Sequence, residues 1–224
     1  MSFDFLFTPV EQLDHLITGL FEGAPLVVAL GIAFLLGLRH ASDPDHLVAV
    51  TSLMAADKGD TRGAARLGAW WGLGHAAALV ALGIPLIAFK AQLPGWLEGG
   101  AEKAIGAVIL LLAARVIYRW ARPRARDLKL RTTGQAMSIG LLHGLAGTGA
   151  VVVLLIAALP TQVEAALALA VFAPMSIVSM TACTAGFAWV LTRPVIEPVY
   201  RTVLIPGLGV FGVMFGLWYA GLGV

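Results

Sequence analysis

Long apolar stretches separated by short polar segments dominate the chain. A helix needs about 20 apolar residues to cross the hydrocarbon core of a membrane. Six stretches approach or exceed that length, and they cover residues 24–56, 66–89, 101–120, 134–159, 162–191 and 199–222. No polar stretch between them is long enough to fold alone. The pattern predicts an all-α polytopic membrane protein with about six transmembrane helices, in a single transmembrane domain over residues 1–224.

The composition supports this prediction and narrows the class of partner. Hydrophobic residues make up 59% of the chain and charged residues only 12%, with a mean hydropathy of +0.88. A soluble domain carries about 25% charged residues. Because the basic residues fall mostly in short connections and not on a solvated face, no nucleic-acid partner is expected. The single cysteine, Cys183, excludes an intrachain disulfide and a cysteine-pair redox mechanism.

The basic residues also predict an orientation. Lys and Arg gather at residues 58–66, 119–131 and 193–201, which alternate with connections that are poor in them. Basic connections prefer the cytoplasmic side. We therefore expect residues 121–133 to form a basic cytoplasmic loop, with both termini outside a bacterial-type inner (plasma) membrane. Residues 1–23 contain no Lys or Arg, so they are predicted to be an interfacial amphipathic segment and not a signal peptide.

A short internal similarity suggests two related halves. Residues 37–41 read Gly-Leu-Arg-His-Ala, and residues 140–144 read Gly-Leu-Leu-His-Gly. With three helices in each half, the halves would have opposite orientations, as in transporters built from inverted repeats with broken helices. The pattern therefore predicts a 3+3 inverted repeat with a broken first helix.

The first apolar stretch contains the most unusual polar cluster of the chain. Residues 39–46 read Arg-His-Ala-Ser-Asp-Pro-Asp-His. A charged group at the bilayer centre costs at least about 2.5–3.5 kcal/mol, so such residues usually have a function. On a regular helix His40, Asp43 and His46 share one side, whereas Asp45 lies about 140° from His40.

Pro44 changes this geometry, because proline cannot continue a regular helix. It lacks an N–H and clashes with the carbonyl four residues earlier, that of His40. We expect a kink that brings Asp45 inward and leaves the His40 carbonyl without its usual partner. The alternative is a helix end at the cytoplasmic boundary, with Asp43 as N-cap and a new interfacial helix starting at Pro44.

Histidine and aspartate together can bind a divalent transition metal. His75 lies near the middle of the second apolar stretch, beside Gly72 and Gly74, which favour a close helix contact. It is predicted to be a ligand or to line the ion path. The candidate metal ligands are His40, Asp43, Asp45, His46 and His75.

Four further polar residues are candidates for an ion pathway. Arg39 is expected to pair with Asp43 or Asp45, or to extend to the membrane interface. His143 lies in a glycine-rich segment, where it either lines the path or bonds a carbonyl. Ser176 and Ser179 either line the path or bond the backbone.

With these motifs in hand, the chain resembles the nickel/cobalt transporter family, the NicO and NiCoT group. The family hallmark Arg-His-Ala-x-Asp-x-Asp-His is matched by residues 39–46, and its second signature, Leu-Gly-His, by residues 73–75. The resemblance implies that His40, Asp45, His46 and His75 recognise and pass Ni²⁺ or Co²⁺. The short chain is similar to the compact branch associated with urease accessory roles. Residues 144–149 lack the acidic side chains of a later signature found in members with eight helices.

The resulting prediction is a transporter or permease for Ni²⁺ or Co²⁺, with no prosthetic group and no enzymatic activity. A mixed His/Asp site suits these ions better than Mg²⁺ or Ca²⁺, which favour oxygen ligands. The expected partners are the metal ion and the lipid bilayer, with a metallochaperone or a second copy as further candidates. The alternatives are a metal exporter for resistance, an intramembrane metal-dependent hydrolase and a non-transporting accessory protein.

Overall fold

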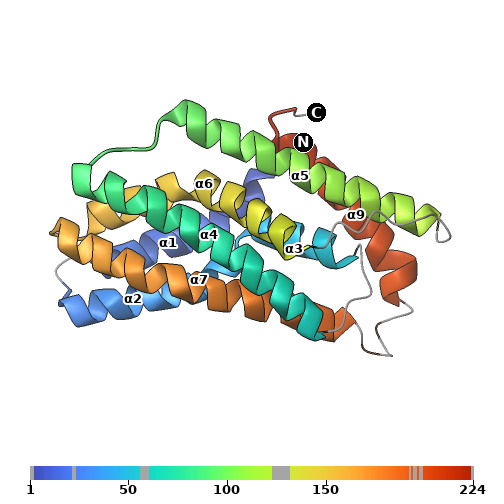
Figure 1. Cartoon of the computed structure of the whole chain (residues 1–224), viewed down its shortest axis with the longest axis horizontal. Helices are drawn as coiled ribbons and strands as arrows, with labels where there is room; N and C mark the ends of the chain where they lie inside the picture. Colours follow the sequence, from blue (N-terminus) through green and yellow to red (C-terminus); the bar gives the residue numbers. More distant parts are fainter. Residues whose placement is uncertain are drawn as a thin grey trace.

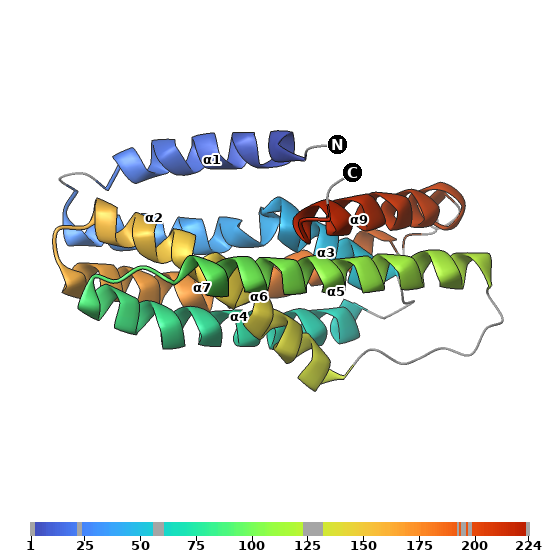
Figure 2. The same ribbon diagram turned by 90° about the horizontal axis from the view of Figure 1, so that it is seen from above.

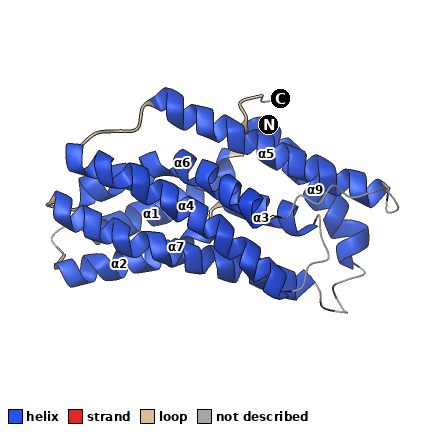
Figure 3. Cartoon of the chain, viewed as in Figure 1, coloured by secondary structure: helices blue, strands red, loops and turns tan. Residues whose placement is uncertain are grey.

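The computed structural model describes residues 3–21, 24–55, 61–122, 132–191, 193, 196 and 199–222. All regular secondary structure in these residues is helical, which confirms the predicted all-α class (Figure 3). The elements are α1 (Asp4–Gly19), α2 (Leu26–Arg39), a 3-10 turn (His40–Ser42), α3 (Pro44–Ala55), α4 (Thr61–Phe89), α5 (Gly95–Ala121), α6 (Thr133–Ala158), α7 (Gln162–Leu191), a π-helical turn (Tyr200–Leu204) and α9 (Ile205–Tyr219).

Several of these helices are long and apolar enough to cross a membrane. In the described part of the chain they are α4, α5, α7 and the segment Thr202–Tyr219. The pair α2 and α3 counts as a fifth span if it is one broken helix, bent by 46°. All six predicted stretches coincide with helices, including α6. The number of six spans and the inverted repeat stay predictions.

Two predicted segments are described only in part. α1 runs alongside the bundle, with its axis roughly along that of α2 and its chain direction opposite, and it does not cross the end of the bundle (Figure 2). The helix expected near the N-terminus is therefore present, and its place at a membrane surface stays a prediction. Most of the predicted basic loop, residues 123–131, lies outside the described residues.

The bundle is organised around α4, which packs against both α6 and α7 (Figure 1). α2 packs against α7, and α5 packs against α9. Glycines set the distance between α4 and α6. A Cβ added to Gly74 would collide with the Met137 carbonyl, and one added to Gly140 with the Trp71 carbonyl. Small residues let membrane helices approach this closely, so the backbones of α4 and α6 are in direct contact.

The close approach of α4 and α6 positions two histidines on adjacent helices. A Cβ built on Gly144, next to His143, would lie 2.5 Å from the carbonyl oxygen of His75. Both imidazoles are almost fully buried. The helices on which His75 and His143 lie are thus held together at the level of these two residues.

Candidate metal centre

The break in the first apolar stretch is present. α2 ends at Arg39, Asp43 adopts an extended conformation, and α3 begins at Pro44. Proline disfavours the helical conformation in the residue before it and is well suited to the first position of a helix. The His40 carbonyl is not left unpaired, because it accepts the Asp43 N–H at 3.2 Å. The local geometry is thus a helix end followed by a helix starting at Pro44, and not a simple kink.

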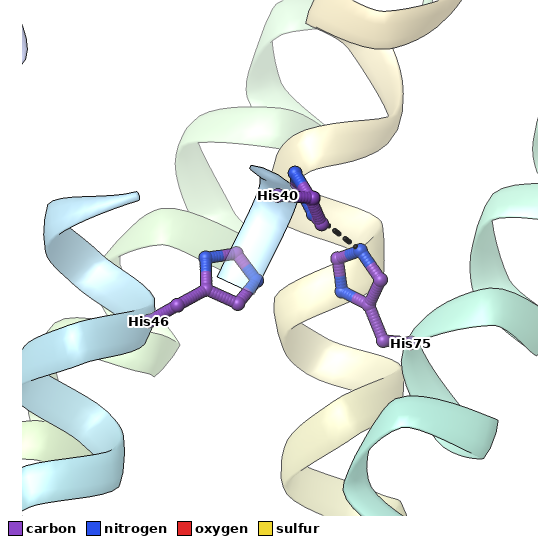
Figure 4. A group of neighbouring side chains, drawn as sticks. All are labelled: His40, His46 and His75. Atoms are coloured by element: carbon purple, nitrogen blue, oxygen red, sulfur yellow. Dashed lines mark hydrogen bonds between the residues drawn. The ribbon is translucent and has the colours of Figure 1, made fainter. Parts of the chain in front are cut away.

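The break brings three buried imidazoles together. His40 lies on the 3-10 turn, His46 on α3 and His75 on α4 (Figure 4). Each offers a ligand atom within 4.8 Å of those of the other two. The Nε2 atoms of His40 and His75 are 2.8 Å apart and share a hydrogen bond. These three residues are called the three-histidine group below.

A second group overlaps the first and uses Asp45, His46 and His143, again with ligand atoms within 4.8 Å of one another. Asp45 Oδ1 accepts a hydrogen bond from His46 Nδ1 at 3.0 Å. Its Oδ2 lies 3.0 Å from His143 Nε2, on α6. Asp45 therefore joins α3 to α6, and His46 belongs to both groups. We call this set the aspartate group.

The two groups contain ring nitrogens that the protein leaves unbonded. His46 Nε2, His75 Nδ1 and His143 Nδ1 are buried and have no hydrogen-bond partner in the described part of the chain. Buried polar atoms are usually satisfied. Several open imidazole nitrogens in one cluster have the donor chemistry that a transition metal requires.

Asp43 lies outside both groups and contacts His40. Its Oδ2 lies 3.0 Å from His40 Nδ1, the ring nitrogen that does not face His75. Its Oδ1 lies 3.1 Å from Arg39 Nη1. Arg39 thus pairs with Asp43, one of the two pairings expected. Asp43 was predicted as a ligand, and it belongs to neither group of mutually close ligand atoms.

The two serines on α7 contact the backbone. The Ser179 hydroxyl donates to the Leu38 carbonyl at 2.6 Å and accepts the Ala41 N–H at 3.1 Å. Ser176 donates to the carbonyl of Ala173 in its own helix at 2.8 Å. Both hydroxyls therefore follow the backbone-bonding alternative. Ser179 in addition holds α7 against the end of α2 and the turn that carries His40.

Trp71 is a site residue that sequence reasoning missed. Its ring lies 5.6 Å from the rings of both His46 and His143, and its indole nitrogen is buried with no hydrogen-bond partner in the described residues. Trp71 precedes His75 by one helical turn, so the two residues share a face of α4. That spacing was the available signal. The His40 ring in turn packs on Phe172 of α7.

The site contacts two apolar clusters. Trp71 belongs to one cluster of buried residues and Phe172 to the other. The imidazoles therefore contact both apolar clusters.

The comparison with protein families fits this site. Residues 26–121 match the NicO family model, described as a high-affinity nickel-transport protein. The resemblance to the nickel/cobalt transporters is confirmed. The matched segment contains the whole three-histidine group and Asp45, whereas His143 follows it in the chain.

A second similarity extends over most of the chain. The chain is 25% identical over 208 residues to the urease accessory protein UreH of Bacillus sp. (strain TB-90). The alignment covers 87% of this chain and 91% of that relative. No solved structure matches the chain.

Proposed function

We propose that this protein carries a divalent transition metal ion, Ni²⁺ or Co²⁺, across a bacterial-type inner membrane through the three-histidine group. The observation that carries the proposal is the meeting of three buried imidazoles at a helix break, with ligand atoms within 4.8 Å of one another. The match of residues 26–121 to a nickel-transport family supports the same cargo.

The ligand chemistry favours transition metals over hard cations. Imidazole nitrogen suits nickel, copper and zinc, whereas Mg²⁺ and Ca²⁺ are bound mainly by oxygen. Asp45 is the acid that belongs to one of the two groups, and it lies 3.0 Å from His46 and from His143. One carboxylate with several imidazoles is a poor shell for Mg²⁺ and a good one for Ni²⁺ or Co²⁺.

Asp43 orients the His40 ring for metal binding. A carboxylate that accepts the N–H of one ring nitrogen fixes the tautomer and directs the lone pair of the other nitrogen toward the ion. With its Nδ1 held by Asp43 at 3.0 Å, His40 presents Nε2 toward His75. Arg39 balances the charge of Asp43 from the other side. We therefore assign Asp43 an orienting role and not a place among the ligands.

Transport also requires the ion to reach the site within an apolar bundle. The broken pair α2–α3 supplies irregular backbone at the site, and such backbone is tolerated at membrane depth only when it is buried in protein or lines a cavity. An accessory role without transport is the second candidate, and the similarity to a urease accessory protein favours it. Export for resistance uses the same site in the opposite direction. An intramembrane hydrolase would need metal-activated water in place of net flux.

Metal flux into reconstituted vesicles tests the proposal. Purified protein is reconstituted, and uptake of Ni²⁺, Co²⁺, Zn²⁺ and Mn²⁺ is followed separately, with flux in both directions recorded. We expect flux of Ni²⁺ or Co²⁺, and its loss in His75→Ala. His15→Ala is the matched control, because His15 lies on α1 and the proposal does not use it. Absence of flux for all four ions, or full flux in His75→Ala, overturns the proposal.

A further inference from the structure

The geometry points to a second metal position in the aspartate group, and we propose that the ion passes between the two groups through His46. This inference rests on the proposed function and deepens it. In the first position the three-histidine group would bind the ion. In the second position Asp45, His46 and His143 would bind it. His46 is the ligand common to both positions.

The two positions are adjacent and otherwise use different ligands. The His46 ring lies 4.4 Å from the His143 ring in a stacked arrangement, and 4.6 Å and 5.2 Å from the rings of His40 and His75. Apart from His46, the first position uses ligands from the 3-10 turn and α4, and the second uses ligands from α3 and α6. An ion can therefore exchange every ligand except His46 while moving a few ångströms.

His46 is suited to bridge the two positions because its two ring nitrogens have different surroundings. Nδ1 contacts Asp45 at 3.0 Å, whereas Nε2 is buried with no hydrogen-bond partner in the described residues. A neutral imidazole can carry its proton on either nitrogen. His46 can therefore offer a lone pair toward the aspartate group in one tautomer and toward the three-histidine group in the other.

The remaining ligands of each group hold one another through hydrogen bonds of similar length. His40 Nε2 and His75 Nε2 are 2.8 Å apart, and His143 Nε2 lies 3.0 Å from Asp45 Oδ2. Each shared proton occupies the place between two ligand atoms that an ion would take. The positions differ in charge, because only the second includes a carboxylate. We expect the aspartate position to hold a divalent ion more tightly than three neutral imidazoles do.

Only one of the two positions holds an ion at a time. Two divalent ions that share one imidazole would repel each other strongly in an apolar surrounding. The proposal therefore predicts a stoichiometry of one ion per chain with two alternative ligand sets. Removing His75 or His143 leaves one set intact, and removing both leaves neither.

Co²⁺ binding to the purified full chain, followed by visible absorption and titration calorimetry, tests this prediction. We expect one Co²⁺ per chain in the wild type, His75→Ala and His143→Ala, and no binding in the double variant or in His46→Ala. X-ray absorption should show only nitrogen ligands from the protein in His143→Ala, and a mixed nitrogen and oxygen shell in His75→Ala. Double-variant binding equal to that of His75→Ala overturns the second position.

Flux measurements separate transfer from a structural role of His143. The hydrogen bond between His143 and Asp45 would tie α6 to α3 even if no metal visited it. His143→Gln keeps a side chain that can bond Asp45 but is a poor ligand. Under the proposal both His143→Ala and His143→Gln retain Co²⁺ binding and lose Ni²⁺ flux, with an unchanged melting temperature in the glutamine variant. Wild-type flux in His143→Gln overturns the transfer step.

The two proposals fail differently. If His75→Ala retains full flux, the three-histidine site is wrong and the proposed function falls. If His75→Ala loses flux while His143→Ala does not, the proposed function stands and only the second position is refuted.

Discussion

Residues 37–41 and 140–144 share the pattern Gly-Leu-x-His, yet their helices behave differently. α2 ends at Arg39, whereas α6 continues unbroken from Thr133 to Ala158. Both histidines reach the candidate metal centre. The difference is that Pro44 and two aspartates follow His40, and no proline or acid follows His143 within α6. Proline and acids thus turn one of two similar helix segments into a cluster of ligands, while the other supplies a single imidazole.

The two segments are alike in how their glycines pack. Gly37 lies against α7, where an added Cβ would come within 2.6 Å of the Phe172 carbonyl oxygen. Gly140 lies against α4 and would meet the Trp71 carbonyl. α2 packs on α7 as α6 packs on α4. This correspondence is what the predicted inverted repeat requires, and the repeat stays a prediction.

The largest effect on the fold should follow from filling these glycines. Gly140→Ala places a methyl group against the Trp71 carbonyl, so α4 and α6 must separate. Overpacking costs about 1–3 kcal/mol and at times more, so we expect a lower melting temperature in detergent and less folded protein. Gly37→Ala should behave similarly if the two halves are equivalent.

Gly147→Ala is the matched control for this prediction. It lies on the same helix as Gly140, and nothing comes within 4 Å of its added Cβ. Equal melting temperatures for Gly140→Ala and Gly147→Ala would contradict the close contact. A large loss for Gly140→Ala with none for Gly37→Ala would show that the two halves differ in packing as well as in the break.

The next largest effect is expected on metal affinity, when the charge of Asp43 is removed. Asp43→Asn keeps the size of the side chain but removes the charge that holds His40 Nδ1 and pairs with Arg39. Loss of such an orienting partner typically lowers metal affinity about 10–100-fold. We expect a decrease in this range in a Ni²⁺ titration of the His143→Ala background, where only the three-histidine group remains to bind the ion. Complete loss of binding would mean that Asp43 is itself a ligand.

A smaller effect should follow from removing the proline. Pro44→Ala restores an N–H and removes the ring that prevents a continuous helix. The segment then becomes more like α6, and Asp45 is drawn away from His46. We expect several-fold weaker Co²⁺ binding, with titration calorimetry as the measurement. Pro85→Ala, at an exposed position inside α4, is the control and should bind as the wild type does. Equal affinities in the two variants would show that Pro44 is not needed to place Asp45.

The same contrast explains what could be predicted from the sequence. The positions of the six apolar stretches and the break at Pro44 follow from local pattern. The set of His40, His46 and His75 was expected from two motifs on consecutive helices and from the family resemblance. The contact of His143 with Asp45 does not follow from either, because the two residues lie 98 positions apart and meet only when α6 packs into the bundle. The partner of the His40 carbonyl was also missed, since the 3-10 turn gives it the Asp43 N–H at 3.2 Å.

The smallest effect should come from the serine that holds the broken segment against α7. Ser179 bonds the Leu38 carbonyl and the Ala41 N–H, which lie on either side of His40 in the sequence. Ser176 instead bonds the Ala173 carbonyl of its own helix. A hydrogen bond contributes about 0.5–1.5 kcal/mol. We therefore expect Ser179→Ala to lower the free energy of unfolding by about 1 kcal/mol. In the His143→Ala background, where only the three-histidine group remains, it should also weaken Ni²⁺ binding slightly, because the turn that carries His40 is less restrained. Ser176→Ala should leave Ni²⁺ binding unchanged in the same titration. If both variants bind Ni²⁺ equally well, the turn is positioned by Pro44 and Asp43 alone, and the break owes nothing to its contact with α7.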